Sequence, residues 1–419
     1  DFLRKMAKDT DVEALRRWFC DDVLRVYRNQ RVLDKEGIFI GDASYLFVPD
    51  NSNYESSVKL LFDEHNHPVN LEQYEELSDE GKIRCQWRRC YKMVTLLHTN
   101  RDLEFFIFVA VRVVAGNEHE CPILYELVRE FAQGAGKGVM KRLILDRGFI
   151  DGEAISMCKK DYGIDILIPV RRNMDIYRDA MALFRLPEVD WVCCQDPPAE
   201  RTELARPRPK AIVKREEKRQ EKLKEAKPSP PLEETLVKTQ TAVIGQFTSW
   251  QSCTVPLSVV ANREHYADGH EKIWLLIDTK KVHNPCQARE DYHLRTATEE
   301  RYRQLKCFAD LTHFTSRAFS MVVNQVVFIM LSYNLLQIYL LHQARKELNK
   351  KTPPRIRQQL LPSDNHIIVY WQNYYGLFTP LEFAETIASL GEQARKKIAH
   401  KSRRLRRELN EAMTNPRAP

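Results

Sequence analysis

A short segment near residue 300 combines a carboxylate, two cations and a phenol at regular spacing. The four residues lie 3, 4 and 7 positions apart and are Tyr292, Arg295, Glu299 and Lys306. On a helix that turns by about 100° per residue, they fall within an arc of roughly 60°. Such a face suits a metal-binding acid set among phosphate contacts. The same spacing also fits an ordinary amphipathic helix with an i, i+4 ion pair between Arg295 and Glu299.

Two further acids follow short apolar runs that predict β-strands. Residues 37–41 precede Asp42, and residues 142–145 precede Asp146. If these acids meet Glu299, the three carboxylates repel one another and raise their own pKa values unless cations neutralise them. Carboxylate oxygens are hard ligands that select Mg2+ or Mn2+. The acids therefore predict a candidate metal site.

The elements around these acids predict an α/β fold. After a helical segment at 2–32, we expect a strand at 37–41, a loop with a short helix at 50–82, strands at 91–98 and 105–114, a helix at 122–133, a strand at 142–145, a helix at 153–160 and a strand at 164–170. This is the element order of a ribonuclease-H-like mixed sheet flanked by helices. In that topology the first and fourth strands are neighbours, which would bring Asp42 and Asp146 together.

The chain changes character after residue 184. Lys and Arg outnumber Asp and Glu by five in the Pro-rich residues 199–231, which predicts a solvated linker or projecting helix, or else a contact with DNA phosphates. Strand patterns at 241–250, 253–261 and 272–278 predict a β-rich insertion in the α/β core. From 395 to 407, eight of thirteen residues are Lys or Arg, which fits a DNA-binding tail or a solvated helix equally.

The predicted organisation has five parts. They are an N-terminal helical segment at 1–36, the first part of the core at 37–183, the linker and β-rich insertion at 184–285, the second part of the core with the Glu299 helix at 286–345, and a basic helical region at 346–419. The first residue is Asp1 rather than Met, so we expect an N-terminal piece that could hold an end-recognition region to be missing.

Composition narrows the class of protein. The 419 residues are 43% hydrophobic and 29% charged, which excludes collagen, pure coiled coil and wholesale disorder. The net charge of +7 permits a polyanionic partner. The 10 cysteines contain no C-x2-C pair, so we expect free thiols in a reducing compartment. No signal peptide is evident, and the apolar residues 318–341 carry Asn and Gln, which predicts a buried core helix rather than a membrane span.

Three motifs resemble those of the DDE-class bacterial insertion-sequence transposases. The spacing Y-x2-R-x3-E-x6-K matches their signature, Leu143–Phe149 looks like their second-aspartate motif, and Ile38–Tyr45 looks like their first. The resemblance covers about residues 37–342. Three departures are the D-A-S sequence at Asp42 in place of D-G-T, Thr298 in place of an aliphatic residue, and a second acid, Glu300, beside Glu299.

This resemblance implies a DNA transposase that cleaves strands at the ends of an insertion sequence and joins them to target DNA. By resemblance, the catalytic and metal-binding residues are Asp42, Asp146 and Glu299, which would hold two Mg2+ ions, with Mn2+ as a substitute. The implied DNA-binding residues are Tyr292, Arg295, Lys306, Arg147 and Trp274. The implied partners are double-stranded terminal inverted repeats and target DNA, bound by a homodimer at the nucleoid in the bacterial cytoplasm, with no membrane.

Several alternatives stay open. The chain could be an inactive or domesticated DNA-binding protein, or a purely hydrolytic nuclease on the same fold. Trp274 and Trp250 could stack a flipped base, but Trp274 lies in an apolar run that predicts a core strand. Residues 63–67 include His65 and His67 and suggest a metal cluster, yet a surface loop is the simpler interpretation. The glycines at 134, 136 and 138 suggest a phosphate loop or, more simply, a helix stop.

Overall fold

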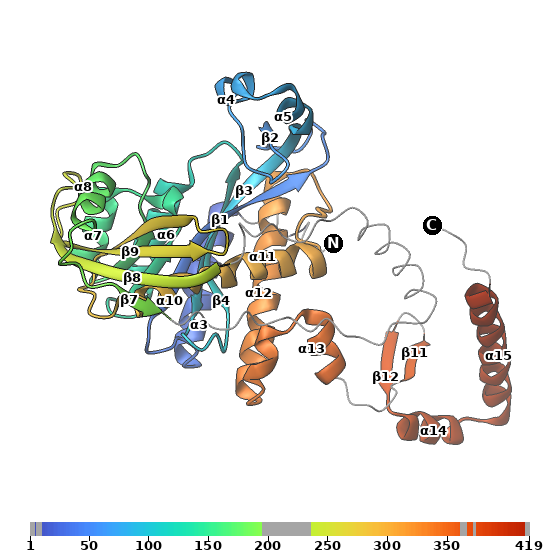
Figure 1. Cartoon of the computed structure of the whole chain (residues 1–419). Coiled ribbons are helices and arrows are strands. Elements are labelled where there is room, and N and C mark those ends of the chain that lie inside the picture. Colours follow the sequence, from blue (N-terminus) through green and yellow to red (C-terminus); the bar gives the residue numbers. More distant parts are fainter. Residues whose placement is uncertain (1–4, 6–10, 195–235, 361–366, 372–373, 415–419) are drawn as a thin grey trace. The chain divides into compact units, whose positions relative to one another are not determined.

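The computed structural model describes residues 5, 11–194, 236–360, 367–371 and 374–414. These belong to two compact units, Asp1–Thr352 and Pro353–Pro419. The predicted linker at 199–231 lies outside the described residues. Figure 1 shows the elements in sequence colours, with a mixed sheet and its helices in the first unit.

The first unit is built on one mixed β-sheet. Its central strands are β1 (Ile38–Val48), β3 (Gln86–Thr99), β4 (Ile107–Ala115), β5 (Arg142–Leu145) and β6 (Asp165–Pro169). They lie in the order β4-β3-β1-β5-β6, in which β1, β3 and β4 are antiparallel while β1, β5 and β6 are parallel. This order confirms the predicted ribonuclease-H-like sheet. The apolar side chains of β5 are fully buried, as expected for a central parallel strand.

Two strand predictions near the N-terminus were wrong. Asp42 was expected to end its strand, but β1 continues for six more residues, because residues 43–48 pair with β3 from Val94 back to Arg89. The stretch at 50–82 contains an unpredicted strand, β2 (Val58–Phe62), which pairs with the start of β3. Two short helices follow β2, α4 (Leu71–Glu76) and α5 (Asp79–Arg84). In Figure 1 these elements extend from the upper end of the sheet.

Helices cover both faces of the central strands. On one face lies α6 (Glu120–Ala135), whose Phe131 ring packs 4.9 Å from that of Phe39 in β1. On the other lies α11 (Thr296–Phe308), whose Tyr302 hydroxyl is 2.7 Å from Thr95 Oγ1 in β3. Thr95 is paired with Asp42, which points away from α6 because side chains alternate along a strand. The crossovers also contain η2 (Arg147–Phe149), α7 (Gly152–Tyr162) and α8 (Asp175–Leu183).

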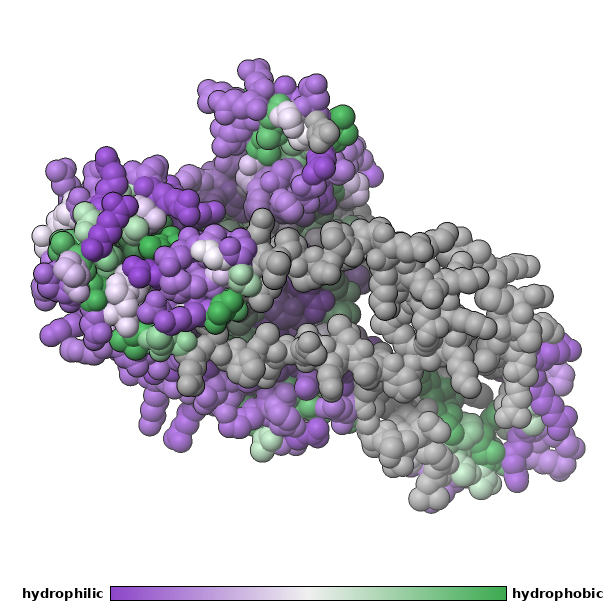
Figure 2. Space-filling view, viewed as in Figure 1, coloured by the Kyte–Doolittle hydropathy of each residue, from purple (hydrophilic) through white to green (hydrophobic). Residues whose placement is uncertain are grey.

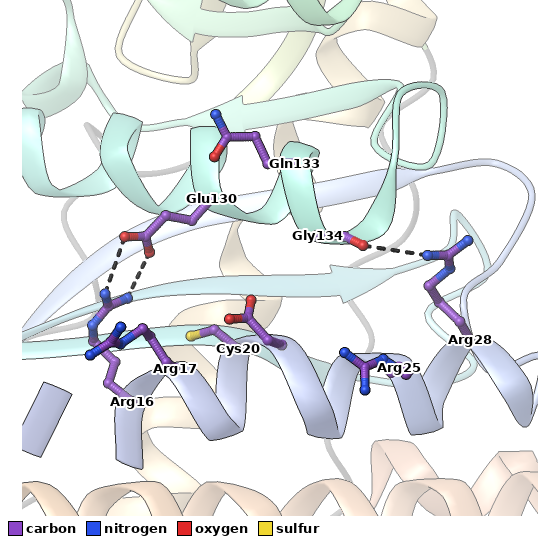
Figure 3. Close-up of a pocket in the computed structure, with 9 residues that line it drawn as sticks. Arg16, Arg17, Cys20, Arg25, Arg28, Glu130, Gln133 and Gly134 are labelled. Atoms are coloured by element: carbon purple, nitrogen blue, oxygen red, sulfur yellow. Dashed lines mark hydrogen bonds and ion pairs between the residues drawn. The ribbon is translucent and has the colours of Figure 1, made fainter. Parts of the chain in front are cut away.

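The N-terminal segment forms a helix with a π-helical turn. Its parts are α2 (Val12–Arg17), η1 (Trp18–Val23) and α3 (Leu24–Asn29). Figure 3 shows how it lies along α6: Arg16 pairs with Glu130 at 2.6 Å, and Arg28 donates to the carbonyl of Gly134. The described part of residues 2–32 is therefore helical, as predicted, and it is joined to the core by ion pairs as well as by buried side chains such as Phe19.

The long apolar segment is the core helix α12 (Phe319–His342). By length and composition alone it could cross a membrane. However, Asn334 accepts a hydrogen bond from the backbone N–H of Phe108 at 2.9 Å and donates to its carbonyl at 2.7 Å. Gln337 accepts another from the N–H of Phe106. These buried amides join α12 to β4, in agreement with the predicted core helix.

The strands of the predicted insertion extend the same sheet. They are β7 (Val192–Cys194), β8 (Leu236–Phe247), β9 (Leu257–Tyr266) and β10 (Glu271–Asp278), and β10 pairs antiparallel with β6. The sheet therefore runs on from β6 through β10, β9, β8 and β7 without a break. The chain then enters α10 (Pro285–His293) and α11. The insertion thus fixes the point from which the Glu299 helix starts.

The expectation of free thiols was wrong for one pair. Cys194 at the end of β7 and Cys286 at the start of α10 form a disulfide across 92 residues. Sequence spacing gave no signal for this pairing, because the two cysteines meet only through the β7–β8 strand pairing and the fold of α10. The other eight cysteines are free, and five of them are buried.

The second compact unit contains short elements and a long basic helix. They are α13 (Pro353–Leu360), β11 (Ile367–Trp371), β12 (Tyr374–Phe378), α14 (Pro380–Ser389) and α15 (Glu392–Thr414). The antiparallel strands β11 and β12 form a two-stranded sheet. The basic cluster at 395–407 lies on α15, and η4 (Lys346–Lys350) ends the first unit. The clustered charge is thus helical, and its partner stays a matter of prediction.

We predict that the chain purified without reductant has eight reactive thiols after denaturation, because Cys194 and Cys286 are joined. Thiol titration in denaturant, with and without a phosphine reductant, measures this number. The reduced chain should titrate all 10 cysteines. A count of 10 without reductant would contradict the disulfide. The Cys286→Ser variant is the control, because it cannot form the disulfide and its thiol count should not change when reductant is added.

Candidate active site

Asp42 and Asp146 are neighbours because their strands are paired in parallel. The register sets Gly41 of β1 beside Leu145 of β5, so the next residue on each strand is an aspartate. Asp146 ends β5 and caps η2 by accepting the backbone N–H of Arg147 at 2.8 Å. Asp42 lies inside β1, with only 9% of its surface exposed. The sheet thus holds one buried carboxylate next to one at a strand end.

Gly41 allows helix α6 to approach β1 directly beside Asp42. A Cβ atom at this position would lie 2.6 Å from the Leu145 side chain and 2.8 Å from that of Leu124 in α6. Both contacts are shorter than van der Waals separation, so a larger residue would force the buried Leu145 and Leu124 side chains to shift. The small residue therefore keeps Asp42 close to β5 while α6 closes the opposite face.

Glu299 lies on the first turn of α11, which covers the Asp42 face of the sheet. The sequence predicted one continuous helix through Tyr292, Arg295 and Glu299, but the structure divides it. Helix α10 ends at His293, and Leu294 and Arg295 form a turn with helical backbone angles before α11 begins. The prediction that these residues share the face of one continuous helix is therefore wrong. Arg295 and Glu299 nonetheless meet, at 2.6 Å.

Arg295 connects two of the three carboxylates. Its Nη2 atom lies 2.6 Å from Glu299 Oε1, and its Nη1 atom lies 3.7 Å from Asp42 Oδ2. The Arg295 side chain is 19% exposed, whereas that of Glu299 is 56% exposed. The guanidinium therefore supplies the positive charge that holds the acidic groups near one another.

Asp42 has a strongly perturbed carboxyl group. Its pKa is raised to about 7, mainly by burial and also by the charges of Asp146 and Glu299, while Arg295 and the N–H of Ala43 oppose the shift. The same burial acts on Lys306, whose pKa is lowered to about 8 although Asp42 favours its charged form. Groups with such shifts in a shared site are candidates for chemistry.

The predicted DNA contacts lie at different depths. Lys306 donates to Ser44 Oγ at 2.7 Å and so reaches β1 two residues beyond Asp42. Tyr292 is half-buried, and burial raises its pKa to about 12. Arg147 is exposed beside Asp146. Of these, Lys306 and Arg147 offer cations on either side of the carboxylates.

Trp274 is held in the insertion by a polar network. Its Nε1–H donates to Glu264 Oε1 at 3.0 Å, and its ring centroid lies 5.7 Å from that of Tyr292. Arg289 forms an ion pair with Glu264 at 3.0 Å. The Trp274 ring therefore packs beneath α10. Trp250 is also half-buried, against the main hydrophobic core.

A buried ionic network that was not predicted from the sequence joins the parts of the site. Arg142 at the start of β5 binds both carboxylate oxygens of Asp278 at 2.6 Å. Its guanidinium also lies 3.8 Å from Asp291 on α10, which pairs with Arg101 at 3.1 Å. The network ties the Asp146 strand to the end of β10 and to the helix leading to Glu299. The one sequence signal for this network was Asp278, an acid that follows an apolar run.

The remaining sequence candidates are placed outside this site. His65 and His67 have side chains that are 71% and 75% exposed in a surface loop. Gly136 ends α6 with φ of 92°, as the helix-stop interpretation predicted. Within the described residues, no three His, Cys, Asp or Glu side chains stand close enough to hold a metal ion. The three acids thus interact electrostatically, and the Arg295 guanidinium lies near two of them, but they do not form a closed set of metal ligands.

Comparison with known proteins gives one family. The family model of the transposase DDE domain matches residues 55–335. Asp146 and Glu299 lie within the match, and Asp42 lies before it. A search of curated proteins finds no match for the chain.

We predict that Asp42→Asn makes the metal-free protein more stable at pH 8 and gives a clearly smaller gain at pH 5. Asp42 has a raised pKa of about 7 when folded, against 3.8 as its ordinary value, so the folded state binds the extra proton between these values. Wild-type stability therefore falls as pH rises toward 7, whereas asparagine stays neutral. The gain at pH 8 is on the order of 2–4 kcal/mol.

Urea unfolding in a chelator at both pH values measures the difference. An equal effect of Asp42→Asn at pH 5 and pH 8 would contradict the buried, raised-pKa carboxyl group. Asp50→Asn provides the matched control, because Asp50 is half exposed and its pKa is lowered by Lys59.

Proposed function

Because the chain belongs to the transposase DDE domain family, we propose that it cleaves DNA strands at the ends of an insertion sequence and transfers them to target DNA. The observation that carries the proposal is the meeting of Asp42 and Asp146 on paired parallel strands, with Glu299 approaching over the same face. The Y-x2-R-x3-E-x6-K spacing supports placement among the insertion-sequence members. The family implies DNA binding and a nuclease or transposase chemistry.

The donor set of the site fits a divalent metal by its chemistry. DDE transposases generally use divalent metal ions, and three carboxylates supply the hard oxygen ligands that Mg2+ and Mn2+ prefer. Asp42, buried with a raised pKa, lacks full charge compensation in the protein alone. We propose that Asp42, Asp146 and Glu299 hold two Mg2+ ions after Arg295 releases Glu299. Bound there, the ions would activate the attacking hydroxyl and stabilise the leaving oxygen.

The side chains around the acids would orient the DNA. Arg295, once released from Glu299, remains beside Asp42 and can donate to a phosphate with its planar guanidinium. Lys306 would hold a second phosphate from its position at Ser44, and Tyr292 would pack against the backbone. These contacts position the scissile phosphate over Asp42 and Asp146. A first attack by water breaks the bond between the scissile phosphorus and its 3′-oxygen, which leaves a 3′-hydroxyl and a 5′-phosphate. That hydroxyl then attacks a phosphodiester of the target DNA, forms the new bond and releases a 3′-hydroxyl on the target strand.

The homodimer and the nucleoid location stay part of this proposal. Two ends must be joined to one target, so one protomer for each end is the simplest arrangement. A purely hydrolytic nuclease would use the same acids but would leave nicked DNA without joined products. A DNA-binding protein without activity would retain end binding and yield neither product. Assaying both products therefore separates the three possibilities.

We predict that Glu299→Gln abolishes cleavage while Glu300→Gln does not. Loss of a metal-binding carboxylate removes several kcal/mol of transition-state stabilisation, which lowers the rate at least about 100-fold. Glu300 instead pairs with Arg303 at 2.7 Å and accepts from Gln304 at 2.9 Å, so its neutralisation should change the rate by less than about threefold. Nicking and joining of DNA that carries the element's ends, with Mg2+, measures both variants.

The adjacent pair makes this test sharp, because the two changes are chemically identical. Equal activity of wild type and Glu299→Gln would exclude Glu299 as the catalytic acid. Loss of activity in Glu300→Gln alone would assign the catalytic role to Glu300 instead. Circular dichroism and melting temperature establish that both variants are folded.

We also predict that Mg2+ stabilises the wild-type protein at pH 8 but not Asp146→Asn. A metal that binds only the native state raises the melting temperature, here on the order of 5 °C at saturation. Asp146 is half-buried at a strand end and an asparagine there can still accept the Arg147 N–H, so its change should leave the metal-free protein close to wild type. Melting curves with and without Mg2+ measure the shift. An equal shift in both proteins would place the metal elsewhere.

A further inference from the structure

A cavity opens beside the candidate active site, between the extension of the sheet and the end of α11. Its volume is about 670 Å3, within the range of ligand sites in proteins. Residues from β1, β3, α11 and the segment after α11 line it, and among them are Phe47, Trp87, Arg89, Lys306 and Phe314. In the described structure it therefore combines aromatic rings with cations.

Trp87 and Arg89 of the cavity lie on the same face of the sheet as Asp42, whereas Phe47 and Arg88, which also line it, belong to the other face. Asp42 is paired with Thr95 on β3, and side chains at every second residue share one face. Counting back along β3 from Thr95, this face includes Tyr91, Arg89 and Trp87. No register shift interrupts β3 between Thr95 and Trp87 in its pairing with β1 and β2. Thr95, Met93 and Tyr91 on this face are fully buried, so the link between the carboxylates and the cavity runs through Lys306 rather than along β3.

Lys306 joins the two regions. Its Nζ atom donates to Ser44 Oγ, two residues along β1 from Asp42, and its side chain also lines the cavity. Arg89 adds a second cation, with its Nε atom 3.6 Å from Asp50, which also pairs with Lys59. The acid is thus shared between two cations. This leaves the lining with a positive excess, which favours an anionic ligand.

Trp87 provides an open aromatic surface at the far end. Its side chain is 54% exposed although it is one of the largest apolar groups on β3. Figure 2 shows that the surrounding extension of the sheet is mainly hydrophilic, with a small hydrophobic group at its upper part. An exposed indole beside cations is the combination that binds unpaired nucleotides, by stacking and by phosphate contacts.

We propose that the surface from Lys306 to Trp87 binds one unpaired DNA strand as it leaves the active site, with a base stacked on Trp87. This inference rests on the proposed function and extends it from the motif residue Lys306 to Trp87, which belongs to none of the sequence motifs. Thr95 and Trp87 are eight residues apart, about 27 Å at 3.4 Å per residue. An unpaired strand that spans this distance is several nucleotides long.

Two sources could supply such a strand. One is the DNA that flanks the element's end, separated near the cleaved phosphate, and the other is locally opened target DNA. Both offer the same chemistry, a flexible phosphate chain with exposed bases. Duplex DNA is a poorer match, because its bases are stacked on one another and cannot lie against Trp87.

The test measures binding in a chelator, so that no cleavage is required. The probes are a blunt duplex, the same duplex with an unpaired extension of about ten nucleotides on one strand, and a free oligonucleotide with that extension's sequence. We expect Trp87→Ala to weaken binding of the extended duplex roughly 5- to 150-fold and to leave the blunt duplex within twofold. Trp87→Phe should bind almost as wild type, because it retains a stacking ring.

The control variant is Tyr339→Ala, which removes an aromatic ring that is 50% exposed on α12. Weaker binding by Trp87→Ala of the extended duplex alone assigns the strand to flanking DNA, and weaker binding of the free oligonucleotide as well assigns it to any unpaired strand, target included. Unchanged binding of the extended duplex would overturn the proposal. So would an equal loss for all probes, or the same loss in Tyr339→Ala.

Failure of this inference and failure of the proposed function give different results. Without transposase activity, Trp87→Ala still shows selective loss of the extended probe while wild type cleaves nothing. If only the stacking site is wrong, wild type and Trp87→Ala cleave and bind alike. Melting temperatures of the variants exclude misfolding as the cause of either result.

Discussion

The candidate site depends on bringing negative charges together on a sheet that excludes water from one of them. Parallel pairing of β1 and β5 sets Asp42 beside Asp146, and α11 adds Glu299. Burial leaves Asp42 only partly ionised near neutral pH, as its raised pKa of about 7 indicates. Arg295 relieves part of this by contacting Asp42 and Glu299 at once. In the protein alone, the Arg295 guanidinium balances part of the negative charge of the carboxylates. A divalent cation would balance this charge more completely.

A second, buried ionic group holds the elements that carry the three carboxylates in position. Arg142 and Asp278 are almost fully buried and form two hydrogen bonds, and Asp291 with Arg101 completes the network. Removing one partner of such a group leaves an uncompensated buried charge, which is strongly destabilising. The network connects β5, β10 and α10, which are distant in sequence. It therefore links the extended sheet to the orientation of the helix that carries Glu299.

Local sequence signals predicted much of this arrangement. The apolar runs before Asp42 and Asp146, the glycine stop of α6 and the polar residues of α12 each depend on nearby residues, and the structure agrees with the elements they predicted. The parallel neighbours β1 and β5 followed from element order alone. Glu299 could be distinguished from Glu300 by spacing, although the test of its role lies in experiment.

Features that depend on distant partners were missed. The continuation of β1 requires pairing with β3, β2 requires the start of β3, and the disulfide requires β7 to reach α10. The turn at Leu294 and Arg295 lies within a segment of helical composition, so periodicity could not reveal it. Arg142 and Asp278 are 136 residues apart, and nothing in either neighbourhood specifies the other. Residue spacing along the chain cannot supply such pairings.

The most direct test of the central claim is to locate Mn2+ by anomalous scattering in crystals of the protein. The account predicts manganese bound by Asp42, Asp146 and Glu299, with the Arg295 guanidinium moved away from Glu299. Crystals grown in a chelator should retain the Arg295 bridge. If saturating Mn2+ leaves these carboxylates without metal and Arg295 still joined to Glu299 and Asp42, the account is contradicted.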